Sequence, residues 1–167
     1  MELMVVIVII GIMTAMILPE MRGTFEDALL RSTSRNLVSV FDLASSRAVT
    51  LNQMHRVRLD TTTGRYQVER RVRAGGLEEF LPVNDISGCS GILDKRITFE
   101  ILHPDDATTE PRDAATPAPA LPDAISFYAD GTADATLVTL QDRQGFRLGL
   151  RLNPITARVQ IVEGERQ

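Results

Sequence analysis

The sequence predicts an α+β fold, in which one long N-terminal helix packs on a head of antiparallel strands resembling a β-sandwich. Three observations predict it. Residues 3–18 carry no charge and are almost entirely apolar, residues 30–51 repeat apolar side chains with a helical period, and later segments alternate apolar and polar residues. A long helix followed by many short strands is typical of the α+β class.

The uncharged segment at residues 3–18 reads LMVVIVIIGIMTAMIL. As a helix it is roughly 24 Å long, somewhat less than the hydrocarbon core of a bilayer at about 30 Å. A secretory signal peptide needs basic residues before such a run and a small-residue cleavage site after it, and this sequence has neither. A buried core helix that is apolar on all sides needs a larger protein around it. We therefore predict a transmembrane helix at residues 1–22.

The second half of the helix has a different pattern. Its apolar stripe consists of Leu30, Leu37, Phe41, Ala44, Ala48 and Leu51. These positions follow one face of a 3.6-residue helix, with charged and polar residues on the other faces. We expect the helix to continue to about residue 51 and to pack on the sheets of a globular head that comprises residues 23–167.

Alternation of apolar and polar residues predicts antiparallel strands at residues 55–59, 65–72, 79–83, 96–101, 124–128, 135–140, 145–152 and 157–162. The first two strands form a hairpin with Tyr66, Val68 and Val72 on one face. Most of the prolines fall within residues 103–124, which have neither the helical nor the strand period. We expect an exposed loop there.

Three residues in and beside the apolar segment occur at an informative spacing: Glu2 precedes it, Gly11 lies within it and Pro19 follows it. This arrangement resembles the N-terminal helix of type IV pilins and of type II secretion pseudopilins. The resemblance implies that Glu2 pairs with the N-terminal amine of a neighbouring subunit during filament assembly. It also implies that Pro19 kinks the helix, as its missing N–H allows, and that residues 1–22 are both membrane span and filament stem.

The head carries a second resemblance. Residues 44–60, followed by the Thr-Gly turn and strand of residues 61–69, are similar to the helix end and first hairpin of the GspH/FimT branch. Residues 125–131 and 146–162 resemble that branch's Phe-x-x-x-Gly turn and closing hairpin. The chain departs from the family at Ala157, where the family often has glycine between Thr and Arg.

Together these resemblances imply a minor pseudopilin, a structural subunit of the type II secretion pseudopilus that assists protein export across the outer membrane. Its expected location is the inner membrane, with a single span and the head in the periplasm. The implied partners are other pseudopilins through the N-terminal helix, secreted proteins, and the prepilin peptidase that processes the full-length precursor. The alternative is a minor type IV pilin of the FimT type, which takes part in pilus assembly or DNA uptake.

The sequence contains no pattern that predicts a catalytic, cofactor or metal site. His55 and His103 lie in different segments, and neither has a second ligand four residues away. Cys89 lies in a Gly/Ser-rich turn without a histidine-bearing motif, and no phosphate-binding glycine motif occurs. We therefore expect no enzyme activity, no cofactor and no metal.

Arginines are concentrated on the predicted first hairpin. The candidates for nucleic-acid contact are Arg56, Arg58, Arg70, Arg71 and Arg73. Guanidinium groups bind phosphate well, and some members of the FimT branch bind DNA through arginines near the C-terminus. In this chain the C-terminal residues balance arginine with glutamate, and the net charge is −4. DNA is therefore disfavoured as a partner, and we expect the hairpin arginines to form ion pairs or a solvated face.

Overall fold

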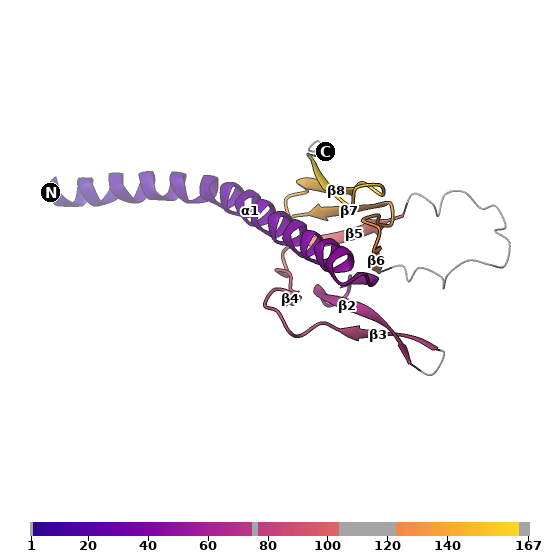
Figure 1. The fold of residues 1–167 in the computed structure, drawn as a ribbon. Coiled ribbons are helices and arrows are strands. Elements are labelled where there is room, and N and C mark those ends of the chain that lie inside the picture. The colour runs from indigo at the N-terminus through magenta and orange to yellow at the C-terminus, as the bar shows by residue number, and fades with distance from the viewer. Residues whose placement is uncertain (1, 75–76, 104–122, 164–167) are drawn as a thin grey trace.

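The computed structural model describes residues 2–74, 77–103 and 123–163 of the chain, with the side chains of residues 2, 15–24, 74 and 77 outside the description. One helix precedes all the described strands, which form two antiparallel sheets beside its C-terminal half (Figure 1). The elements are α1 (Glu2–Thr50), β1 (His55–Asp60), β2 (Arg65–Ala74), β3 (Leu77–Pro82), β4 (Ser90–Ile92), β5 (Thr98–Leu102), β6 (Ala124–Phe127), β7 (Thr136–Gln141), β8 (Arg147–Leu152) and β9 (Val159–Glu163). The predicted fold class is therefore confirmed.

Helix α1 projects beyond the head over its first half and packs on the head over its second half (Figure 1). The buried residues of the predicted stripe are Leu30, Leu37, Phe41, Ala44 and Ala48, each no more than 1% exposed. Burying each large side chain of this stripe stabilises the fold by about 1.5–3 kcal/mol. The remaining predicted member, Leu51, is 49% exposed, so its assignment to the stripe is wrong.

Leu51 is exposed because α1 ends one residue before it. Asn52 adopts a left-handed conformation with φ 48°. The N–H of Gln53 donates to the carbonyl of Ala48 at 3.0 Å, and the N–H of Asn52 donates to the carbonyl of Val49 at 3.2 Å. This pair of bonds is a Schellman motif, which satisfies the last helical carbonyls and turns the chain toward the first strand.

The two sheets pack against the helix with their inner faces. The first sheet has the strand order β3-β2-β1-β6, with β4 also beside β2, and the second has the order β5-β7-β8-β9. Helix α1 contacts β1 and β6 of the first sheet and β7 and β8 of the second. The ring centroids of Phe41 on α1 and Phe127 on β6 lie 6.1 Å apart in the centre of the core.

The predicted hairpin is formed by β1 and β2. The Asp60 carboxylate closes its turn by accepting the backbone N–H groups of Thr62 and Thr63 at 2.9 and 3.1 Å. Tyr66 and Val68 are buried as predicted, whereas Val72 is half-buried. The hairpin is thus confirmed, and its second strand is longer than predicted.

Several other strand predictions need correction: the strand predicted at residues 79–83 begins at Leu77, and the one predicted at residues 145–152 begins at Arg147. The sequence did not predict β4, because a three-residue strand with Gly91 at its centre has no readable alternation. The strand predicted at residues 96–101 begins at Thr98, since the preceding turn is fixed by Asp94. The strand predicted at residues 157–162 begins at Val159, because Ala157 has a left-handed φ of 51°.

The predicted proline-rich loop at residues 103–124 falls almost wholly outside the described residues, at positions 104–122.

Gly91 gives a test of how closely β4 packs on β2. A Cβ atom at this position would lie 2.5 Å from the hydroxyl oxygen and 2.6 Å from Cζ of Tyr66. Tyr66 is only 6% exposed, so its ring cannot move aside freely. We expect Gly91→Ala to lower the free energy of unfolding by roughly 1–3 kcal/mol in a urea titration. Combining it with Tyr66→Leu, which removes the clashing atoms, should cost less than the sum of the two single changes. An unchanged stability of the Gly91→Ala variant would contradict this packing.

Candidate functional site

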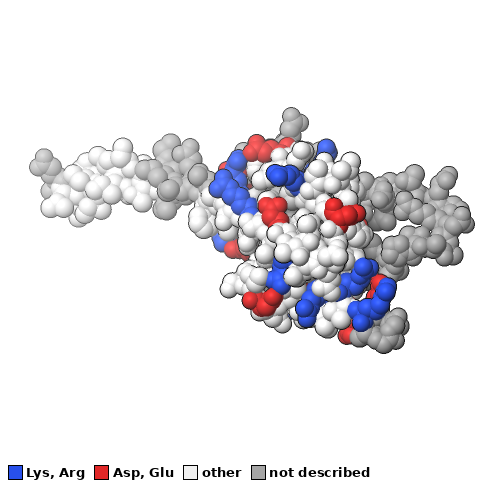
Figure 2. All heavy atoms as spheres, in the orientation of Figure 1, with Lys and Arg blue, Asp and Glu red and all other residues white. Residues whose placement is uncertain are grey.

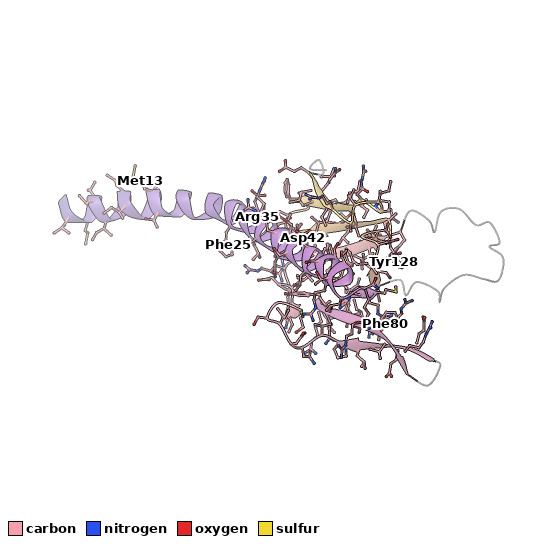
Figure 3. The ribbon with its side chains drawn as sticks, in the orientation of Figure 1. Met13, Phe25, Arg35, Asp42, Phe80 and Tyr128 are labelled. Carbon is pink, nitrogen blue, oxygen red and sulfur yellow. The ribbon has the colours of Figure 1, made fainter. Side chains whose placement is uncertain are left out.

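The first half of α1 exposes an apolar surface that we call the stem surface, residues 3–13. The large apolar side chains along it are 50–75% exposed. They project outward around Met13 (Figure 3), and no acidic or basic side chain interrupts the described part of this surface (Figure 2). Soluble monomers rarely expose a contiguous apolar patch of this size. The stem surface is therefore the main candidate for binding lipid or other apolar helices.

Glu2, Gly11 and Pro19, the residues expected to serve assembly, all lie within α1. Gly11 is exposed on the stem surface, and a Cβ atom placed there would meet nothing within 4 Å. The side chains of Glu2 and Pro19 lie outside the described residues, so their roles in subunit pairing and helix bending stay predictions. Among the residues that the structure describes, no helix has the length and apolarity required to cross a membrane.

Contacts from the second sheet and from the turn before its strand β5 hold α1 at the neck, which we define as the helix from Phe25 to Arg31. The guanidinium of Arg96 lies 5.3 Å from the ring centroid of Phe25. Arg96 is itself bound by the Asp94 carboxylate at 2.9 Å, and this hydrogen bond lowers the pKa of Asp94 to about 2. Arg31 pairs with Glu163 of β9 at 3.0 Å. Sequence reasoning missed the neck, because its members come from three distant segments.

The axis of α1 changes direction before the helix reaches the head (Figure 1). Each exposed ion pair contributes little by itself. The neck contacts add to the buried stripe, and together they hold residues 25–31 of the helix against the head.

Among the arginines proposed for nucleic-acid contact, Arg56 is bound by other side chains of the head. Its side chain is 14% exposed, and its Nε lies 2.6 Å from Oε2 of Glu69, which is 8% exposed. The Phe80 ring on β3, labelled in Figure 3, lies 3.5 Å below the guanidinium. The cation–π contact and the ion pair therefore hold Arg56 away from an external phosphate.

The other four arginines do not form a continuous basic surface. Arg71 and Arg73 both face Glu78 at 3.5 Å. Arg58 and Arg70 are exposed, and neither forms an ion pair with another described residue. Acidic and basic side chains are interspersed over the visible face of the head (Figure 2). DNA binding needs several free phosphate contacts, and this arrangement does not favour it.

Of the titratable groups singled out in the sequence, His55 and Cys89 are buried within the head, whereas His103 is half-buried. His55 is fully buried, with Nδ1 2.8 Å from the carbonyl oxygen of Gln53. Burial lowers the pKa of His55 and keeps its ring neutral near pH 7. Cys89 is also buried, and burial raises the pKa of its thiol, which makes it a weak nucleophile. The described ranges hold no group of three His, Cys, Asp or Glu side chains placed to bind a metal.

Comparison with known proteins gives a structural likeness without a sequence match. No protein-family model matches the chain, and no curated protein is similar to it in sequence. The minor pseudopilin EpsH from the type II secretion system of Vibrio cholerae has a TM-score of 0.59 at 13% identity, covering 86% of this chain and 99% of EpsH. Escherichia coli GspH has a TM-score of 0.58 at 14% identity, covering 81% of this chain and 89% of GspH. The fold is that of the minor pseudopilins.

The likeness extends to a pilus protein. The type IV minor pilin FimU of Pseudomonas aeruginosa has a TM-score of 0.54 at 16% identity, covering 82% of this chain and 90% of FimU. The pseudopilin fold predicted from the N-terminal and hairpin motifs is therefore confirmed, whereas these identities carry no information about individual site residues.

Arg56 distinguishes a structural role of the hairpin arginines from a ligand-binding role. Replacing it with alanine leaves the Glu69 carboxylate largely buried without its partner, which is strongly destabilising. We expect Arg56→Ala to lower the free energy of unfolding by about 3 kcal/mol. Arg73→Ala, whose side chain is 77% exposed, should change it by less than about 0.5 kcal/mol. Urea denaturation of both variants checks this, and equal small effects would show that Arg56 is not part of the folded framework.

Proposed function

We propose that this chain is a minor pseudopilin, a structural subunit of the type II secretion pseudopilus that assists protein export across the outer membrane. The observation that carries the proposal is an uncharged, exposed helix surface attached to a head with the fold of EpsH and GspH. The chain acts mechanically, as a subunit that binds other subunits, rather than as an enzyme. Secreted proteins are proposed partners of the head.

In this proposal residues 1–22 form a single span in the inner membrane, and the head, residues 23–167, lies in the periplasm. A prepilin peptidase processes the full-length precursor. During assembly the stem surface leaves lipid and packs against the helices of other pseudopilins, so apolar contacts with lipid are replaced by apolar contacts with protein. The neck supports this step, because it attaches the helix to the head next to the point where the stem begins.

Glu2 provides the first test of the assembly role. A carboxylate within an apolar bundle is costly unless a cation pairs with it, so Glu2 pairing with a neighbouring N-terminal amine would favour incorporation. We expect Glu2→Ala to reduce copurification of the full chain with its partner pseudopilins at least tenfold, while the melting temperature of the head stays unchanged. Glu79→Gln, which removes an exposed carboxylate of β3, is the matched control and should copurify normally. Normal copurification of the Glu2 variant would refute the assembly role of Glu2.

A minor type IV pilin is the second candidate function, and the likeness to FimU is the observation that favours it. Deleting the gene separates the two candidates. A pseudopilin deletion should abolish export of secreted enzymes and leave surface motility intact. Loss of motility or of DNA uptake with normal export would instead favour the pilus.

A further inference from the structure

The outer face of the first sheet holds a cleft of about 460 Å³ where β1, β2 and β4 lie side by side. Its lining residues are Arg58, Asp60, Arg65, Tyr66, Gln67, Ser90, Gly91 and Ile92. The cleft lies on the face opposite to the one that packs on α1, so the buried core does not occupy it.

Strand register places the polar lining residues together. Arg58 is paired with Gln67, and Asp60 with Arg65, in the antiparallel β1–β2 ladder. Directly paired residues and residues two apart share a face, so all four side chains project outward. Tyr66 alternates with them, and its side chain belongs to the buried face. Arg58 and Arg65 are therefore diagonal neighbours across the cleft.

Within the described part of the head, neither of the two guanidinium groups is paired with an acidic side chain. Arg58 and Arg65 are exposed, and neither forms an ion pair with a described residue. Asp60 is close in register, yet both of its oxygens are engaged by the hydroxyl groups of Thr62 and Thr63, at 2.5 and 2.6 Å. The cleft therefore presents two cations whose hydrogen-bond donors remain available to a ligand.

The rim of the cleft adds an apolar contact and a free strand edge. Ile92 is 62% exposed there. Strand β4 pairs only with β2 among the described strands, so its other edge carries unpaired backbone groups that an extended segment can bind.

We propose that this cleft binds an extended acidic segment of another protein, with a Glu or Asp carboxylate between Arg58 and Arg65. Guanidinium–carboxylate pairs form charge-assisted, often bidentate hydrogen bonds. One carboxylate from the ligand balances the charge of the cleft, because Asp60 already offsets one of the two positive charges. A nucleic-acid backbone fits less well, because its successive phosphates would lie near Asp60 and would make no use of Ile92.

This inference adds a docking surface on the head that is separate from the stem surface of the proposed function. Copurification of the Glu2 variant depends on the stem, whereas the test below measures ligand binding to the outer face of the first sheet. Failure of one therefore does not imply failure of the other.

The test uses the full chain in micelles of a nonionic detergent, labelled with ¹⁵N. The probes are the peptide acetyl-Gly-Glu-Ile-Glu-Gly-amide, its Gln-for-Glu counterpart, inorganic phosphate and a short DNA duplex. Chemical-shift changes of the Ser90 and Ile92 amides report the Kd. The test variant is Arg58→Gln with Arg65→Gln.

The matched control is Arg147→Gln with Arg151→Gln, which removes two exposed arginines from the outer face of β8.

We expect saturable shifts with the acidic peptide and at least tenfold weaker binding by its Gln counterpart. The Arg58/Arg65 double variant should bind the acidic peptide at least tenfold more weakly, and the control within about twofold of the unmodified chain. Absence of saturable binding, equal affinity for both peptides, or an unchanged Kd in the double variant would overturn the proposal. Tighter binding of phosphate or DNA through Arg58 and Arg65 would overturn it as well, in favour of a phosphate site.

Discussion

The packing of the second half of α1 between the two sheets is the contact on which the rest of the structure depends. Ala44 and Ala48 are fully buried and small, so the helix can approach the inner faces closely, while Phe41 fills the centre against Phe127. The same helix continues without interruption to Glu2. The core therefore anchors the stem as well as stabilising the head.

The neck restrains α1 at the point where the helix leaves the sheets. A helix that was held only by its C-terminal turns could swing at the point where it leaves the sheets. Arg31 bridges to the last described strand, and Phe25 contacts Arg96 in the loop before β5. A force along the stem of a proposed filament subunit would therefore act on the second sheet through the neck, as well as on the C-terminal turns of the helix.

Sequence patterns predicted those parts of the fold that depend on local periodicity. Leu148, Leu150 and Leu152 alternate with outward residues and are all buried, because a half-buried strand imposes a period of two. The failures occur where conformation depends on contacts from outside the segment. Strand β4 is too short to show a period and exists because β2 offers it a free edge, and Ala157 adopts a left-handed turn that its own side chain does not favour.

The sequence by itself determined the uncharged stem, with Glu2, Gly11 and Pro19 at their spacing, and the helical stripe that follows. Both are properties of consecutive residues, and the free energy of transferring an apolar helix out of water needs no tertiary partner. Only the tertiary structure decided what the hairpin arginines do. Arg56 reaches Glu69 and Phe80 once the β1–β2–β3 register is formed, whereas Arg58 and Arg65 form no ion pair with a described residue, and the nearby Asp60 is engaged by the Thr62–Thr63 turn. Side chains so similar in chemistry differ in role because ion pairing depends on distances that only the folded sheet fixes.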